Sequence, residues 1–193
     1  YAFRVLQLPI GVFVIAVSQV ALPSLTSVIS QGSGSRDIAD NLYKAISLVL
    51  WFIFPCFVFV VVNSEDIVRL LYQQGAFSSH DSSMTSKVLF YYSFSLFGYG
   101  CMKVLTTYYY ATGRTNYPMW VGFFTIGLHF FALYFFTKKY GVNGIAISSF
   151  CTLSINGAFL FCGLIYDRLL WPWKKTFLTL FFLVFATVAS YYL

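Results

Sequence analysis

The chain has 193 residues, of which 59% are hydrophobic and only 9% are charged, and its mean hydropathy is +0.76. Soluble globular proteins carry about 25% charged residues, so this composition excludes an ordinary soluble domain and indicates a membrane protein. The net charge of +6 is scattered over polar segments without an aromatic-interleaved basic patch, which argues against nucleic-acid binding.

Six long apolar segments follow one another along the chain, each near the ~20 residues that a helix needs to cross ~30 Å of hydrocarbon. Their unbroken apolar runs exclude a porin-like barrel, so we expect an all-α, polytopic helical membrane protein with a single transmembrane domain over 1–193. The helices are expected at about 3–30, 41–62, 84–111, 118–137, 142–167 and 173–193. Because the chain opens within an apolar segment and without Met, we also expect it to be a fragment of a longer protein.

The first helix carries an arginine near its start. At 100° per residue, Arg4, Gln7, Gly11 and Ser18 fall within a stripe about 60° wide. A guanidinium keeps its proton and costs a few kcal/mol in hydrocarbon, so Arg4 must face protein, water or an anion. Two interpretations stay open: Arg4 snorkels to the headgroups at the membrane edge, or its stripe lines a cavity or another helix. The continuation of the polar stripe into the membrane favours the second.

A short amphipathic helix is expected at 64–75, between the second and third membrane helices. Two acidic residues occupy its first turn, where the helix dipole favours negative charge. Ile67, Leu70 and Leu71 share one face, which is typical of a helix lying along the membrane surface.

Two further ionisable side chains lie inside apolar segments. Lys103 is about 15 Å along its helix from the turn at Gly113, which is further than a lysine stem can snorkel. A functional or interhelical role and a packing role both remain open for it. His129, without a visible carboxylate partner, is interpreted as a hydrogen-bonded interhelical residue, with a proton relay as the alternative. The four cysteines lack metal-site or disulfide spacing and are expected to be small apolar fillers.

The distribution of Lys and Arg among the loops predicts the orientation. The segments 31–44, 112–118 and 167–175 hold six of these residues, whereas 63–87 and 138–141 hold four. By the positive-inside rule, the first set is expected in the cytoplasm, and residues 64–83 outside.

Four stretches together resemble the MurJ/MviN family of lipid II flippases, and their order and spacing agree with that family throughout. They are YAFRVLQLPIGVF at 1–13 with ALPSL at 21–25, IVRLLYQQGAF at 67–77, KVL at 103–105 with YYATGRTNYP at 109–118, and GVNGIA at 141–146. The resemblance covers the whole chain and corresponds to the eighth to thirteenth membrane helices of a family member.

The resemblance implies the second-lobe portion of a two-lobed MurJ/MATE-like bundle of the MOP exporter superfamily, built around a cationic cavity. It further implies alternating access that moves undecaprenyl-diphosphate-linked lipid II from the cytoplasmic to the periplasmic leaflet of the bacterial inner membrane. The implied partners are lipid II, the phospholipid bilayer and the missing N-terminal lobe of the same protein.

On this mapping Arg4 matches a cavity arginine of the family, and the candidate ligands for the headgroup and diphosphate are Arg4, Gln7, Ser18 and Lys103. No catalytic residue, metal or cofactor is expected, because no nucleophile, general base or metal-ligand cluster is visible in the sequence. Two alternative functions stay open: another MOP-superfamily exporter that moves polysaccharide-linked carriers or drugs, or a non-transporting relic of a flippase.

Overall fold

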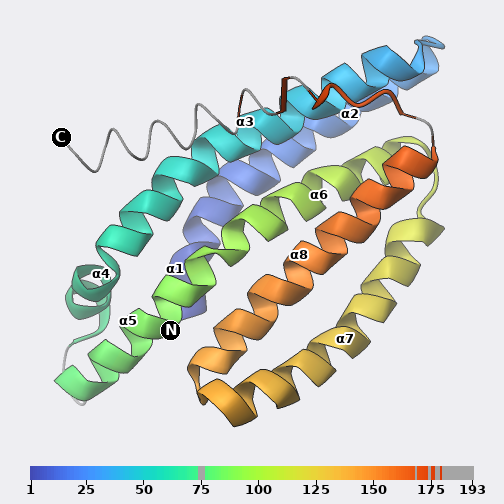
Figure 1. The fold of residues 1–193 in the computed structure, drawn as a ribbon. Coiled ribbons are helices and arrows are strands. Elements are labelled where there is room, and N and C mark those ends of the chain that lie inside the picture. The colour runs from blue at the N-terminus through green and yellow to red at the C-terminus, as the bar shows by residue number, and fades with distance from the viewer. Residues whose placement is uncertain (74–76, 168, 174, 177–178, 180–193) are drawn as a thin grey trace.

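The computed structural model describes residues 1–73, 77–167, 169–173, 175, 176 and 179. Within these residues the chain forms helices and no strand, and the long helices run alternately up and down (Figure 1). In chain order the elements are α1 (Ala2–Pro9), the π-helix η1 (Ile10–Ile15), α2 (Ala16–Ser30), α3 (Ser35–Val62), α4 (Ser64–Tyr72), α5 (Ser79–Ser93), α6 (Ser95–Ala111), α7 (Asn116–Tyr140) and α8 (Asn143–Tyr166).

Five spans in the described part of the chain are long and apolar enough to cross a membrane. Three are the single helices α3, α7 and α8, and two are composite: α1–η1–α2 and α5–α6. The expected class of an all-α, multi-pass membrane protein is therefore confirmed. Most of the sixth helix expected at 173–193 lies outside the described residues.

The first span contains a change of helical register. Pro9 has no N–H to give to a preceding carbonyl, and its ring crowds the turn before it. Directly after Pro9 the chain forms η1, in which backbone N–H groups bond to the carbonyl five residues earlier instead of four. Such a turn rotates less per residue than an α-turn, so the side chains of α2 are displaced around the axis relative to those of α1.

The helix expected from 41 begins six residues earlier, at Ser35, after an extended residue at Gly34 and with Asp37 in its first turn. The helix expected at 64–75 is present as α4 and ends at Tyr72, and the last two residues of its expected range lie outside the described part. Its Leu70 and Leu71 are 79% and 54% exposed. These leucines face outward, and the location of α4 at the membrane surface stays a prediction.

The span α5–α6 begins earlier than the expected residue 84 and is interrupted near its middle. Ser78 and Asp81 form a reciprocal capping box, which satisfies the first free N–H groups and starts the helix at Ser79. The hydroxyls of Ser93 and Ser95 each donate to a carbonyl three residues earlier, at 2.6 Å. Such bonds compete with the backbone hydrogen bonds of the helix, and α5 gives way to α6 between these two serines.

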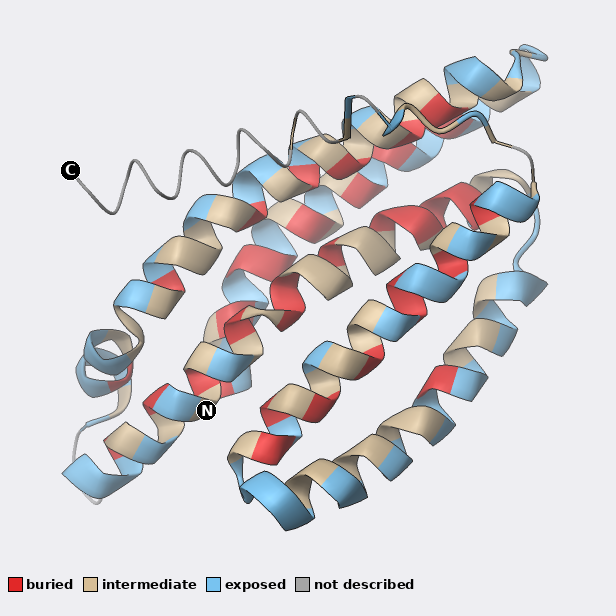
Figure 2. Ribbon diagram, in the orientation of Figure 1, coloured by how far each residue is buried: buried red, intermediate tan, exposed pale blue. Residues whose placement is uncertain are grey.

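Buried side chains gather along α6, which packs against α2 and α3 on one side and against α8 on the other, whereas α7 is largely exposed (Figure 2). Glycines bring α6 close to its neighbours, as expected for helix packing in membranes. A Cβ at Gly98 would lie 3.1 Å from the Ser154 nitrogen of α8, and one at Gly100 would lie 2.6 Å from the Ile53 side chain of α3.

Two glycines build the tight turn between α7 and α8. Gly141 has a φ of +59°, a backbone conformation that residues with a Cβ rarely adopt. Gly144 lies so close to the end of α7 that an added Cβ would overlap the backbone of Phe136 and Thr137. The turn therefore depends on the absence of a side chain at both positions.

We expect Gly144→Ala to destabilise the protein by about 1–3 kcal/mol, because a backbone carbonyl cannot rotate away from the new methyl group. Gly127→Ala is the matched control: it lies in α7 with no atom within 4 Å of the place that its new Cβ would occupy, and alanine is the better helix former. Thermal unfolding in detergent measures both variants. Equal unfolding temperatures for the two would contradict the steric assignment.

Candidate functional site

Arg4 lies on the exposed face of α1, next to Phe3, whose ring packs against Tyr92 of α5 at 5.9 Å between centroids. Gln7 and Gly11 are exposed as well. Within the described residues, the Arg4 guanidinium has neither an ion-pair nor a hydrogen-bond partner. The structure thus brings Arg4 and Gln7 together on one open face of a membrane helix.

Ser18 does not share this face. It is only 4% exposed, and its hydroxyl donates to the Val14 carbonyl at 2.7 Å. The expectation of one continuous stripe from Arg4 to Ser18 assumed 100° per residue throughout, whereas the π-turn of η1 rotates less and moves Ser18 into the packed interface.

Lys103 is half-buried on α6, and its ammonium group has no partner among the described residues. Phe3, beside Arg4, meets Tyr92, and Lys103 follows Tyr92 by eleven residues along α5–α6. At 1.5 Å per residue the backbone of Lys103 therefore lies about 16 Å along the bundle from the level of Tyr92 and Phe3. Arg4 and Lys103 do not form one compact site in the structure.

A cavity of about 570 Å³, which we call the α7–α8 cavity, lies among α1, α5–α6, α7 and α8. Its polar lining includes Tyr99 of α6, His129 of α7 and Asn156 of α8. Two cross-helix hydrogen bonds border it, both 3.1 Å long: one joins His129 to Thr152, and the other runs from Asn156 to Thr125. The interhelical role expected for His129 is confirmed by this contact.

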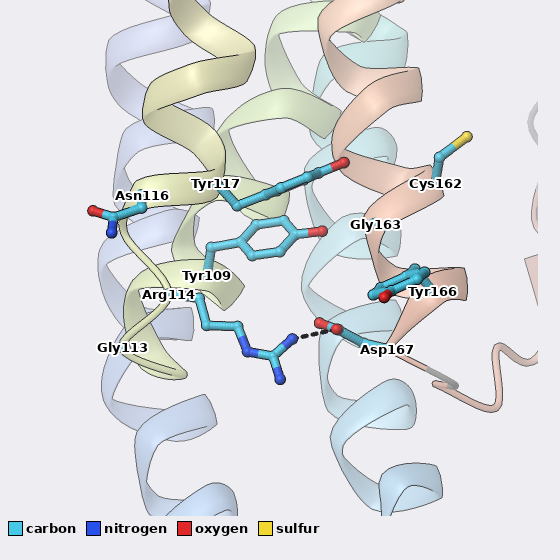
Figure 3. Close-up of a pocket in the computed structure, with 9 residues that line it drawn as sticks. All are labelled: Tyr109, Gly113, Arg114, Asn116, Tyr117, Cys162, Gly163, Tyr166 and Asp167. Carbon is cyan, nitrogen blue, oxygen red and sulfur yellow. Dashed lines mark hydrogen bonds and ion pairs between the residues drawn. The ribbon is translucent and has the colours of Figure 1, made fainter.

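A second cavity, of about 650 Å³, lies at the end of the bundle where α6, α7 and α8 meet (Figure 3). There Arg114, from the α6–α7 turn, points at Asp167 and forms an ion pair with it. The hydrogen bond from Arg114 to Asp167 raises the pKa of the guanidinium further above its ordinary value. The pair ties the α6–α7 turn to the end of α8.

Two tyrosines strengthen the same junction, and their rings lie one over the other in Figure 3. The Tyr109 hydroxyl donates to the Leu160 carbonyl at 2.7 Å, and the Tyr117 hydroxyl donates to the Phe159 carbonyl at 2.8 Å. Any Cβ at Gly163 would collide with both tyrosines. We therefore assign this cavity a structural role in holding α6, α7 and α8 together.

Sequence reasoning found Arg4, Lys103 and His129 because a charged or ionisable group stands out in an apolar run. It missed the bond from Asn156 to Thr125 and the Arg114 ion pair, because these partners are 31 and 53 residues apart. Small polar residues at helical spacing were the available signal for Asn156. Across the described ranges, no group of three His, Cys, Asp or Glu side chains could hold a metal ion.

Comparisons with known proteins agree on one family. The family model described as "Lipid II flippase MurJ" matches residues 1–193. A probable lipid II flippase MurJ from Rhizobium tropici is 29% identical over 190 residues, which is 97% of this chain and 35% of that protein. The lipid II flippase MurJ from Thermosipho africanus is 30% identical over 149 residues, which is 77% of this chain and 30% of that protein.

A solved structure of lipid II flippase MurJ in an inward closed conformation also matches, with a TM-score of 0.77 and 27% sequence identity. The match covers 98% of this chain and 40% of that one. The chain thus spans about a third of the length of the curated relatives described above. Because the family model covers every residue of the sequence, the chain belongs to the MurJ family of lipid II flippases.

Proposed function

We propose that the protein containing this chain is a lipid II flippase of the bacterial inner membrane. It moves the undecaprenyl-diphosphate-linked cell-wall precursor from the cytoplasmic to the periplasmic leaflet by alternating access, with no covalent chemistry. Family membership supports the substrate class, and the five membrane spans suit a transporter. The observation that carries the proposal is the open, unpaired guanidinium of Arg4 on a membrane helix.

Arg4 is proposed to hold the diphosphate. A guanidinium presents a planar fork of N–H donors that grips phosphate oxygens in pairs, and it remains charged at any physiological pH. Gln7, nearly one turn along the same exposed face, offers amide N–H groups to the same anion. Gly11, next along this face, leaves bare backbone with no atom within 4 Å of a Cβ, so the face has room for a large headgroup.

Lys103 is proposed as a second contact further along the path, since about 16 Å of helix separates it from the level of Arg4. Ser18 is left out of the ligand set, because its hydroxyl hydrogen is already bonded to the Val14 carbonyl inside the packed interface. The substrate-binding set is therefore Arg4 and Gln7, with Lys103 as a separate point of contact.

Exchanging the arginine tests its role in the complete gene product. Lysine snorkels as well as arginine but offers only a point charge. Arg4→Lys should therefore preserve activity if Arg4 only snorkels, and should lower activity if Arg4 binds the diphosphate. A charged hydrogen bond contributes about 1.5–3 kcal/mol, so losing one corresponds to a roughly tenfold to hundredfold weaker grip. We expect Arg4→Lys to lose much of the activity and Arg4→Ala nearly all of it, measured by growth complementation of a flippase-depleted bacterium.

The matched control is Arg36→Ala, which removes one exposed arginine at the start of α3, away from the Arg4 face. It is expected to complement as well as the wild type. Membrane abundance is measured in parallel for every variant. Full rescue by Arg4→Ala at normal abundance would remove Arg4 from the mechanism.

The orientation is proposed from the loop charges and from how the loops lie. The α2–α3 and α6–α7 loops and the end of α8 lie at one end of the bundle, and α4 and the α7–α8 turn lie at the other (Figure 1). Lys175 reinforces the first end by donating to the Asp40 carboxylate at 2.9 Å. We place this first end in the cytoplasm and α4 in the periplasm.

Single cysteines at Ser33 and Ser79 test the orientation in a background without the four native cysteines, of which Cys162 is exposed. An impermeant maleimide on intact spheroplasts is expected to label Ser79→Cys, and to label Ser33→Cys only after permeabilisation. The reverse labelling pattern would invert the assignment.

A further inference from the structure

Three neighbouring helices are interrupted at about the same height in the bundle. The first span contains Pro9 and η1, α3 contains Pro55, and the span α5–α6 is broken between Ser93 and Ser95. We call these three interruptions the hinge layer. We propose that it lets the end of the bundle that holds α1, α4, α5 and the last turns of α3 bend as one unit against the rest. The consequence for transport rests on the function proposed above, whereas the hinge itself stands on the geometry of the helices.

Aromatic contacts place the interruptions beside one another. Phe57, two residues after Pro55, packs against Phe94 at the α5–α6 break, with 5.1 Å between ring centroids. Phe13 of η1 stacks on Phe52, three residues before Pro55, at 4.9 Å. Three residues of α-helix span about 4.5 Å, so η1 and the α5–α6 break both lie within about one turn of Pro55.

Each interruption removes or loosens backbone hydrogen bonds of its helix. Pro9 and Pro55 have no N–H to donate to the carbonyl four residues earlier, and each proline ring pushes that turn open. The π-turn is a rare conformation, and Gly11 within it has no atom within 4 Å of the place where a Cβ would lie. At the third interruption, the hydroxyls of Ser93 and Ser95 compete for backbone carbonyls. All three spans are therefore weakest against bending in the same layer.

The helix segments on each side of the hinge layer pack with one another. On one side, α5 packs against α1 and α4, and the end of α3 joins them through Phe57. On the other side, α2 packs against α3 and α6. The helices α7 and α8 are continuous, and hydrogen bonds join them to each other. The bundle therefore divides into an end unit, made of α1, α4, α5 and residues 56–62, and a larger remainder (Figure 1).

A cavity gives the end unit room to move. It has a volume of about 300 Å³ and lies between α1 and α5 on one side and the start of α8 on the other. Its lining includes Phe3 of α1, Val88 and Tyr92 of α5, and Val142 and Ile145 of α8. Among the described residues, no side-chain hydrogen bond or ion pair crosses from α1 or α5 to α8. Closing this cavity therefore breaks no polar contact.

Bending changes the geometry of the proposed substrate contacts. Arg4 belongs to the end unit, whereas Lys103 lies on α6, eight residues beyond Ser95, in the remainder of the bundle. The two cations are therefore on opposite sides of the hinge layer, and their separation changes as the end unit moves. Because the attraction between charges falls with distance, an anion held by Arg4 gains or loses its attraction to Lys103 with the bend. The hinge thereby supplies a step in which the headgroup passes from one cation to the other.

Pulsed EPR distance measurements on the complete gene product, in a background without native cysteines, test the hinge without any transport measurement. Nitroxide labels on Leu71→Cys of α4 and Thr26→Cys of α2, both at exposed positions, span the hinge layer. The matched control pair, Thr26→Cys with Trp120→Cys of α7, lies wholly within the remainder of the bundle. We expect a broad or two-peaked distance distribution for the first pair and one narrow distance for the control. Equally narrow distributions for both pairs would overturn the proposal.

Restoring the missing backbone donors tests the cause of the bending. The double variant Pro9→Ala/Pro55→Ala returns an N–H to both helices, and alanine is the better helix former. We expect the distances across the hinge layer to narrow to one, with an unfolding temperature at or above that of the wild type. The matched control is Pro23→Ala, an exposed proline of α2 outside the hinge layer, which is expected to leave the distribution broad. An unchanged distribution in the double variant would refute the assignment of the hinge to this layer.

Lipid II translocation in proteoliposomes tests the consequence for function. The rate is expected to fall several-fold in Pro9→Ala/Pro55→Ala and to be kept in Pro23→Ala. A wild-type rate in the double variant, with its distances narrowed, would refute the coupling of the hinge to transport. Absence of translocation by the wild type would instead count against the proposed function, and the distance measurements would still decide the hinge.

Discussion

Side-chain hydroxyls in this protein repeatedly donate to a carbonyl three or four residues earlier in their own helix, because hydrocarbon offers them no other acceptor. One kind of hydrogen bond therefore has several different consequences. At Ser93 and Ser95 it accompanies the break between α5 and α6. At Thr152 the same hydroxyl that bonds to its own helix also contacts His129 of α7, so one residue serves both its helix and the junction between α7 and α8.

The same constraint explains how α7 is held in the bundle. Its outer face is apolar and exposed, and Thr125 is its one fully buried residue in the described structure. Its position is fixed by two hydrogen bonds with α8, one that Thr125 accepts from Asn156 and one between His129 and Thr152. The glycine turn at one end and the tyrosine contacts at the other complete the attachment. Packing in hydrocarbon gains little from burying apolar surface, so close backbone approach and polar contacts provide the attachment.

The cations within the spans follow a different rule. A guanidinium or ammonium group inside the membrane requires a counter-charge, water or an anionic ligand. Arg114, in the α6–α7 turn just outside the spans, has Asp167 and so becomes part of a structural junction at the end of the bundle. Arg4 and Lys103 lack such a partner within the described ranges, and about 16 Å of helix separates the level of Lys103 from that of Phe3, the neighbour of Arg4. This contrast separates Arg114, which supports the fold, from Arg4, which is the proposed ligand for the diphosphate.

The sequence alone was sufficient for the membrane class, the all-α fold and the family, because unbroken apolar length and the order of local motifs are properties of consecutive residues. It also singled out Arg4 and His129, since a charge or an imidazole stands out in an apolar run. Only the tertiary structure decided that Ser18 is buried, because a π-turn shifts the register in a way that a fixed 100° period cannot reproduce. The partners of His129 and Arg114 likewise required the fold, since helices that are distant in sequence must pack before their side chains can meet.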